Sequence, residues 1–298
     1  MNKKAISFGE MLWDVFPQAT VPGGATLNVA LRLSSLGIST QMISAVGKEH
    51  AGKELKELLN NRGVDTGLIL KHDTLETGKV FVTLDDKGNG TYTITNPAAW
   101  DEIPLSEPII SAVKEADAFI FGSMSSRHTI TRNTLKHLVE IAPFNVFDIN
   151  LRPPHYSFDT INNLFQKSDL VKLNDEELEI YCSYLGKESN DLHDLARFIS
   201  SLNRDTVICV TLGEKGAFLL HDDQFIHQPG FTVKVADTVG AGDGFLAGLV
   251  SRYLSGDSWQ DSLKYACALG ALVASKETAN PEVTEEEIRN LIKNDQRQ

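Results

Sequence analysis

Asp237-Thr238-Val239-Gly240-Ala241-Gly242-Asp243-Gly244-Phe245 combines three glycines with a carboxylate at an expected change of secondary structure. The preceding residues 232–235 alternate in polarity and predict a strand, whereas apolar residues from Phe245 to Tyr253 recur at helical spacing. Gly240 to Gly242 are therefore expected at a helix N-terminus. Small residues allow close approach of a ligand there, and unpaired N–H groups together with the helix dipole attract an anion such as phosphate.

Asp243 lies in the first turn of this expected helix and has two interpretations. An acidic residue near a helix N-terminus stabilises the helix without any further role. Alternatively, its carboxylate is a general base that takes a proton from a hydroxyl group, while the neighbouring N–H groups hold the phosphoryl group that the hydroxyl attacks.

Composition limits the possible functions. The chain has 298 residues, of which 42% are hydrophobic, enough for a large core. Its net charge of −12 argues against binding of nucleic acid or an anionic membrane. Cys182, Cys209 and Cys267 are widely spaced and are expected to be reduced. The N-terminus lacks the apolar run of a signal peptide and no span of ~20 apolar residues follows, so a cytoplasmic protein is expected.

Strand-like and helical segments alternate along the chain, which predicts an α/β fold with a mostly parallel sheet covered by helices. The expected helices are 25–36, 52–62, 106–115, 128–141, 175–185, 191–202, 243–254 and 258–275. The expected buried strands are 118–121, 146–149, 170–173 and 207–210.

One segment interrupts the alternation, because residues 78–85 and 91–96 are β-rich and residues 86–90 between them favour a turn. This pattern predicts a β-hairpin. The hairpin is either an edge of the main sheet or a small lid, around residues 70–101, that closes over a cleft and excludes water from a phosphoryl transfer.

Several polar residues and glycines lie at the C-terminal ends of the expected strands. They are Gly122, Asp148, Asn150, Asn174, Gly213 and Asp237. Ligands of open parallel sheets bind at the carboxyl ends of the strands, so these residues predict a site at that edge.

Two motifs on this edge have competing interpretations. Asn174 and Glu177 have the spacing of a helix capping box, but Glu177 is also placed to hold a hydrated Mg²⁺. Alternation puts Asp148, Asn150 and Arg152 on one side of the chain, and Arg152 either offsets charge on a transferred phosphoryl group or forms a local ion pair with Asp148.

A third motif opens the first expected helix, where Gly23 and Gly24 allow close approach of a small polar ligand and Asn28 follows one turn later.

Two signatures together resemble the PfkB carbohydrate kinase family along essentially the whole chain. Asp237-Thr238-x-Gly240-Ala241-Gly242-Asp243-x-Phe245 is similar to its C-terminal signature, and Gly23-Gly24-x-x-x-Asn28-x-Ala30 is similar to its N-terminal one. The resemblance implies a ribokinase-like three-layer αβα fold, a single domain over residues 1–298 with a β lid, and ATP as phosphoryl donor.

The resemblance also implies individual roles. Asp243 is the expected catalytic base, and the backbone of Gly240, Ala241 and Gly242 is the expected anion hole. The residues expected to face the sugar or the transferred phosphoryl group are Asp14, Gly24, Asn28 and Arg152. Those expected near the nucleotide are Asn174, Thr211, Gly213 and Gly216. Glu177 is expected near Mg²⁺, through water, and Asp237 near a monovalent cation such as K⁺.

Within the family, Gly9-Glu10-x-Leu12-x-Asp14 and Asp148-x-Asn150-x-Arg152 look most like fructokinases. We therefore expect phosphorylation of a primary hydroxyl of fructose. Ribose, 2-keto-3-deoxygluconate and nucleosides are the alternative substrates, and a non-catalytic sugar or nucleotide sensor is the alternative from another class. A homodimer formed through the β lid is also expected by analogy.

Overall fold

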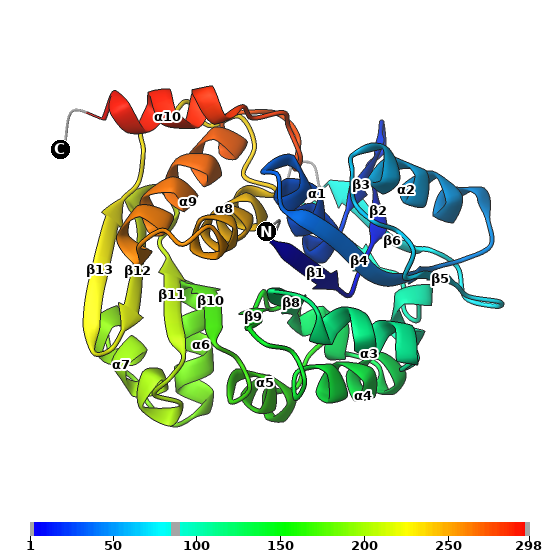
Figure 1. The fold of residues 1–298 in the computed structure, drawn as a ribbon, viewed down its shortest axis with the longest axis horizontal. Helices are drawn as coiled ribbons and strands as arrows, with labels where there is room; N and C mark the ends of the chain where they lie inside the picture. Colours follow the sequence, from blue (N-terminus) through cyan, green and yellow to red (C-terminus); the bar gives the residue numbers. More distant parts are fainter. Residues whose placement is uncertain (1–2, 85–89, 296–298) are drawn as a thin grey trace.

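The computed structural model describes residues 3–84 and 90–295 and is built on a nine-stranded sheet (Figure 1). The strand order is β13-β12-β11-β10-β9-β8-β1-β4-β5. The strands are β1 (Lys4–Phe8), β4 (Ser39–Val46), β5 (Ile69–Lys71), β8 (Ala118–Gly122), β9 (Asn145–Asp148), β10 (Leu170–Asn174), β11 (Val207–Thr211), β12 (Gly216–His221) and β13 (Gln224–Pro229). Only the pairs β11–β12 and β12–β13 of this sheet are antiparallel. The predicted mostly parallel sheet is confirmed.

Helices cover both faces of this sheet, as the three-layer prediction requires (Figure 1). One face carries α3 (Glu107–Lys114), α4 (Thr129–Leu138), α5 (Phe158–Phe165), α6 (Asp175–Tyr184) and α7 (Leu192–Leu202). The other carries α1 (Ala25–Ser35), α2 (His50–Asn61), α8 (Ala241–Leu254), α9 (Trp259–Ala274) and α10 (Glu285–Lys293). Short 3₁₀ turns are η1 (Ala99–Glu102), η2 (Ser123–Ser126) and η3 (Gly213–Lys215).

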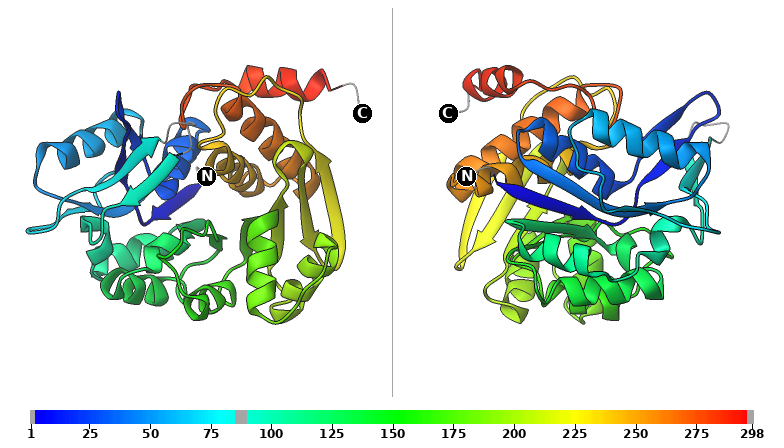
Figure 2. Two further views of the ribbon diagram at one scale, coloured as in Figure 1. Left: turned by 180° about the vertical axis from the view of Figure 1, so that it is seen from behind. Right: turned by 45° about the vertical axis from the view of Figure 1, so that its right-hand side comes forward.

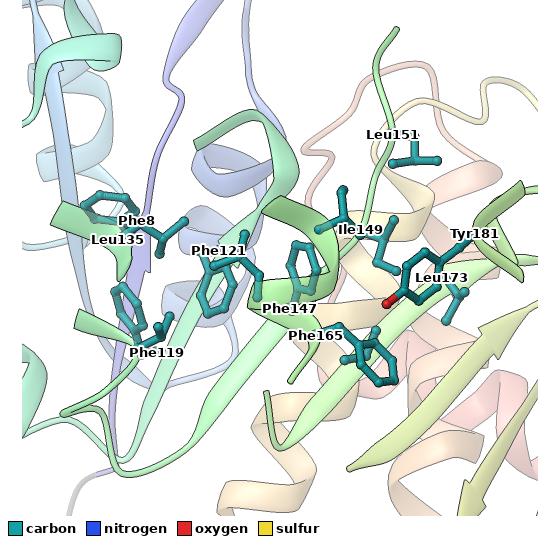
Figure 3. Close-up of a cluster of buried hydrophobic side chains, with 14 of the residues drawn as sticks. Phe8, Phe119, Phe121, Leu135, Phe147, Ile149, Leu151, Phe165, Leu173 and Tyr181 are labelled. Carbon is teal, nitrogen blue, oxygen red and sulfur yellow. The ribbon is translucent and has the colours of Figure 1, made fainter. Parts of the chain in front are cut away.

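The core lies on both faces because successive side chains of a buried strand point in opposite directions. In β8, Phe119 and Phe121 pack on the α3–α7 face, whereas Ala118 and Ile120 pack on the α8–α10 face. Figure 3 shows aromatic residues of the core on the α3–α7 face. The rings of Phe121 and Phe147 stack there with their centroids 5.3 Å apart. A strand with apolar side chains on both faces has no polar alternation, which explains the continuous apolar runs in the sequence.

A separate four-stranded sheet has the order β3-β2-β6-β7. Its strands are β2 (Leu12–Val15), β3 (Thr20–Gly23), β6 (Gly78–Leu84) and β7 (Gly90–Ile94). The predicted hairpin therefore forms, as β6 and β7, but it is not an edge of the main sheet. Figure 2 shows this small sheet, in blue and cyan, at the opposite end of the molecule from β12 and β13. Of the predicted turn at 86–90, residues 86–89 lie outside the described part of the chain.

Several sequence predictions need correction. Residues 232–235 do not form a strand; the next N–H groups, of Ala236 and Asp237, donate to the carbonyl of Ala274 at the end of α9. Alternating polarity favours a strand but does not ensure that a neighbouring strand is present to pair with this segment. Helices α5 and α10 and the hairpin of β12 and β13 were not predicted, whereas the eight predicted helices form with ends within three residues of those expected.

Candidate active site

The carboxyl ends of four neighbouring strands bring most of the predicted polar residues together. Gly122, Asp148 and Asn174 are the last residues of β8, β9 and β10, and Gly213 follows β11. Asp237 is the exception, because it lies in the connection between β13 and α8 rather than at a strand end. The site therefore forms at the predicted edge of the sheet, with α8 added from the far end of the sequence.

Helix α8 begins at Ala241 with Gly240 as its N-cap, so Gly240 to Gly242 lie at the helix N-terminus as predicted. Gly240 has a φ of 78°, and a Cβ atom at this position would lie 2.3 Å from the carbonyl oxygen of Ala279, so only glycine fits. Within the described residues, no side chain caps this helix, and the N–H groups of Gly242 and Asp243 have no acceptor. Two unpaired donors at the positive end of a helix dipole form a site for an anion.

Asp243 is held in place by two asparagines from distant segments. Nδ2 of Asn28, in α1, donates to Oδ2 of Asp243 at 2.7 Å. Nδ2 of Asn280 in turn donates to Oδ1 of Asn28 at 2.5 Å, which fixes the orientation of the amide. Burial raises the pKa of Asp243 to about 6, although the hydrogen bond from Asn28 opposes this shift. A carboxylate with this pKa is ionised at neutral pH and basic enough to accept a proton.

Two further carboxyl groups lie close enough to interact with Asp243. Burial raises the pKa of Asp14 to about 6, and the charge of Asp243 contributes to the shift. Glu10 is 3% exposed, and burial raises its pKa to about 7. Among the described residues its Oε2 has no hydrogen-bond partner. Asp14 was predicted at this site, whereas Glu10 was not.

Gly24 connects these carboxyl groups to α1. It precedes the helix with a φ of 106°, and a Cβ atom would lie 2.7 Å from the carbonyl oxygen of Glu10. The close approach requires glycine at position 24. It also brings Asn28, one turn into α1, within reach of Asp243.

A buried ion pair lies beneath the N-terminus of α8. Nζ of Lys172, in β10, is 2.9 Å from Oδ1 of Asp148, and the two side chains are 9% and 5% exposed. A Cβ atom added to Gly242 would lie 3.3 Å from the same Nζ. Burial alone would lower the pKa of Lys172, but the carboxylates of Asp148 and Glu177 raise it. A fixed positive charge therefore lies next to the anion site, and sequence analysis missed it.

Asn174 and Glu177 form a helix capping box, which was one of the two predicted interpretations. Oδ1 of Asn174 accepts from the N–H of Glu177 at 2.8 Å, and Oε2 of Glu177 accepts from the N–H of Asn174 at 2.9 Å. Oε1 of Glu177 also accepts from the N–H of Leu151 at 2.8 Å. Burial and the charge of Asp148 raise the pKa of Glu177, and these backbone donors oppose the shift.

Arg152 is exposed on the connection between β9 and α5, and its charge lowers the pKa of Asp243. The alternation predicted for Asp148, Asn150 and Arg152 is wrong, because β9 ends at Asp148 and Asn150 has a φ of 39°. In the described part of the chain, Arg152 forms no ion pair with Asp148, which pairs with Lys172 instead.

Three of the predicted nucleotide residues lie at or after the end of β11, and the fourth, Asn174, ends β10. Thr211 ends this strand, Gly213 starts the 3₁₀ turn η3, and Gly216 starts β12 with a φ of 102°. Asp237 lies near the start of α8, where its Oδ1 accepts from the N–H of Val239 at 2.9 Å.

The site has groups that fit the phosphates of ATP and groups that fit Mg²⁺. The open N-terminus of α8 fits a phosphate group. Both oxygens of Glu177 already accept N–H groups, which leaves lone pairs for water and fits a Mg²⁺ ion that keeps its hydration shell. No cluster of three or more His, Cys, Asp or Glu side chains in the described residues is arranged to hold a metal directly.

Comparisons with known proteins identify the family of this chain. The profile of the "pfkB family carbohydrate kinase" matches residues 3–286. A curated relative, fructokinase-1 from Zea mays, is 31% identical over 96% of this chain and 97% of its own length. The chain belongs to the PfkB family and is an ATP-dependent sugar kinase.

Solved structures share the fold. A fructokinase with bound ATP from Xylella fastidiosa superposes with a TM-score of 0.87 at 24% identity and covers 98% of this chain and 99% of its own. A fructokinase from Vibrio cholerae O395, in a form with fructose, ADP and calcium ion bound, gives 0.83 at 24% identity over 97% and 99%. The ribokinase-like fold is thereby confirmed. Of the helices in the described residues, none has the length and apolar character needed to cross a membrane.

Proposed function

We propose that the chain is a fructokinase that transfers the γ-phosphoryl group of ATP to a primary hydroxyl of fructose. The observation that carries the proposal is the carboxylate of Asp243, which has a pKa of about 6 and lies beside the unpaired N–H groups of α8. The 31% identity to the maize fructokinase supports fructose as the sugar.

In the proposed reaction, Asp243 accepts the proton of the sugar hydroxyl as its oxygen attacks the γ-phosphorus. The bond between this phosphorus and the β,γ-bridging oxygen breaks, and ADP leaves. The unpaired N–H groups at the start of α8 stabilise charge on the transferred group, and Arg152 adds a positive charge. The N–H of Ala241, expected in this anion hole, instead donates to the carbonyl of Thr238 at 3.2 Å. General-base catalysis typically contributes roughly 10²–10⁴ in rate.

The remaining residues have positioning roles in this proposal. Asp14, Gly24 and Asn28 contact the sugar. Thr211, Gly213, Gly216 and Asn174 line the nucleotide site. Glu177 would hold a hydrated Mg²⁺, which would neutralise charge on the phosphates, and Asp237 would hold a K⁺ ion. We also place the enzyme in the cytoplasm, because ATP is its substrate and its three cysteines are free thiols.

An ADP-release assay with ATP, Mg²⁺ and K⁺ tests the choice of sugar. We expect fructose to give a higher kcat/KM than ribose, 2-keto-3-deoxygluconate, fructose 6-phosphate or adenosine. Preference for ribose or 2-keto-3-deoxygluconate would leave the role of Asp243 in place and change the assignment of the sugar. No ADP release with any of these acceptors would overturn the proposal.

A homodimer through the small sheet is a second part of the proposal. In β6, Val80 and Val82 are buried within the sheet's apolar cluster, whereas Phe81 between them is 46% exposed. We expect Phe81→Asp to sediment as a monomer under conditions in which the wild-type protein sediments as a dimer. A wild-type monomer, or an unchanged dimer in the variant, would exclude this interface.

A further inference from the structure

A cavity of about 390 Å³ lies at the same sheet edge but is lined by residues with no role in the proposed reaction. Its walls come from three segments: Asn96 after β7, the connection from η2 to α4, and residues 154–157 between β9 and α5. Figure 1 places α4 and α5 on the same face of the main sheet. The cavity therefore lies where the end of β7, in the small sheet, meets the N-terminal ends of α4 and α5.

The lining is basic in an otherwise acidic protein. It includes Arg127, His128, Arg132 and His155, and no Asp or Glu among the described residues lines it, although the chain has a net charge of −12. In the part of the chain that the structure describes, the guanidinium of Arg132 forms two hydrogen bonds, of 3.4 Å to the carbonyl of Ser126 and 3.1 Å to Oγ1 of Thr129, and has no carboxylate partner. Its charge is therefore available to a ligand.

Arg127 also has a hydrogen-bond donor that lacks an acceptor among the described residues. Its side chain is 2% exposed and pairs with Asp101 through Nε and Nη2, at 2.7 Å and 2.5 Å. Its Nη1 is buried and, among the described residues, has no hydrogen-bond partner. A buried guanidinium donor without an acceptor is costly, so an acceptor brought by a ligand would lower the free energy of the site.

Two helices begin at the cavity. The N-cap of α4 is His128, and within the described residues no side chain caps it; the N-cap of α5 is Ser157. Both residues line the cavity, but Oγ of Ser157 accepts from the N–H of Thr160 and caps α5. Of these two termini in the described residues, α4 therefore presents the open one to the cavity.

Burial, together with the charge of Arg127, lowers the pKa of His155, whereas the charge of Asp101 opposes the shift. His155 is therefore neutral at pH 7 and offers a ring N–H as a hydrogen-bond donor, not a charge.

We propose that this cavity is a second anion site, distinct from the phosphate site at α8, and that it binds the phosphate monoester or carboxylate group of a small molecule. The ligand contacts Nη1 of Arg127, the side chains of Arg132 and His155, and the N-terminus of α4. The site also has a route to the small sheet, because Nη2 of Arg127 donates to the carbonyl of Thr95 at 2.7 Å and Nε2 of His128 lies 2.5 Å from Oδ1 of Asn96. These contacts join the cavity to the segment that follows β7.

Calorimetric titration with inorganic phosphate tests the site without any need for turnover. The protein is first saturated with fructose and a non-hydrolysable Mg·ATP analogue, which occupies the α8 site, and ionic strength is kept constant with chloride. We expect phosphate to bind the wild-type protein, and Arg132→Gln to weaken this binding about tenfold or more, because it removes charge-assisted hydrogen bonds. Exposed Arg204→Gln, which loses the same charge elsewhere, should bind like the wild type.

His155→Asn provides a second variant in case Arg132→Gln is poorly folded, and circular dichroism checks both. Weaker phosphate binding in a folded His155→Asn variant would support the site in the same way. Absence of phosphate binding in the wild type, or equal affinity in the Arg132, His155 and Arg204 variants, would overturn the proposal.

The anionic group has two possible sources, and kinetics separates them; this second test rests on the proposed kinase function. If the group belongs to the acceptor sugar, Arg132→Gln raises KM for fructose 6-phosphate or 2-keto-3-deoxygluconate and leaves KM for fructose unchanged. If it belongs to a separate effector, phosphate changes KM for fructose in the wild type, and Arg132→Gln removes that effect. Either result supports an anion site. If phosphate binds but neither KM for the anionic sugars in Arg132→Gln nor KM for fructose in the presence of phosphate changes, the site has no role in the reaction.

Discussion

Two helix N-termini lie at the same sheet edge and differ in how their N–H groups are satisfied. At α6, the side chain of Asn174 accepts from the backbone of Glu177 and the side chain of Glu177 accepts from the backbone of Asn174. At α8, glycine takes the N-cap position, and among the described residues no side chain accepts a capping hydrogen bond from the helix. The first terminus is satisfied by the protein itself, and the second is available to a ligand.

The difference shows that an anion site is recognised by an unsatisfied helix terminus, not by a helix terminus alone. Lys172 lies between the two helices: its charge is paired with Asp148, interacts with Glu177 and lies against Gly242. The open terminus therefore has a fixed positive charge beneath it as well as unpaired N–H groups. Each of these components can be removed separately.

Substitution of the base is expected to have the largest effect. Asp243→Asn keeps an oxygen that can accept from Asn28 but cannot take a proton, so kcat with fructose should fall by roughly 10²–10⁴. ATP and fructose affinities, measured by calorimetry, should change little. The matched control is Asp175→Asn in the first turn of α6, which should leave kcat close to that of the wild type. A variant of Asp243 that retains most of its kcat would remove the distinction between the two helices.

Loss of the buried cation should mainly affect stability. Lys172→Met leaves Asp148 charged, buried and unpaired, which typically costs about 3–5 kcal/mol in the free energy of unfolding. Urea denaturation at pH 7 measures this difference. Replacing both partners, with Lys172→Met and Asp148→Leu, should recover much of the stability but not the activity. A single variant as stable as the wild type would show that the pair is dispensable.

Closing the open terminus with a methyl group should have an intermediate effect. Gly240→Ala forces a left-handed φ on alanine, at a cost of about 1–2 kcal/mol, and also brings Cβ against the carbonyl oxygen of Ala279. Gly37→Ala is the control, because Gly37 has a φ of 82° and no atom within 4 Å of the added Cβ. Gly240→Ala should be the less stable of the two and should lose ATP affinity. Equal losses would mean that the contact with Ala279 has no effect.

Removing the cap of α6 should have the smallest effect. Asn174→Ala deletes one side-chain acceptor, which typically costs about 1 kcal/mol, and thermal unfolding measures the loss. Asn174→Asp keeps an acceptor and should retain most of the stability. If Asn174→Ala reduced ATP affinity without changing stability, the capping role of Asn174 would be secondary to a role in nucleotide binding.

Sequence patterns predicted the parts of the site that depend on local chain geometry. The glycines around Ala241 indicated the open start of α8, and the spacing of Asn174 and Glu177 indicated the cap of α6. The hairpin of β6 and β7 was predicted for the same reason, because its strands are adjacent in the sequence.

Features that depend on distant contacts were not predicted. Lys172 stands in an apolar strand and gave no sign that it would pair with Asp148 from the neighbouring strand. Likewise, the burial of Glu10 follows from the packing of the Gly24 turn against it. The strand expected at 232–235 did not form, since alternation of polarity does not specify a pairing partner.

The pH dependence of kcat/KM for fructose tests the assignment of Asp243 most directly, since this parameter reports the ionisation of the free enzyme. The base must be deprotonated, and burial raises the pKa of Asp243 to about 6. Activity should therefore fall tenfold per pH unit well below pH 6 and level off above it. Asp14→Asn should keep this acid limb, because Asp14 is not the base. A profile that is flat from pH 5 to 8, or an acid limb that disappears with Asp14→Asn, would contradict the account.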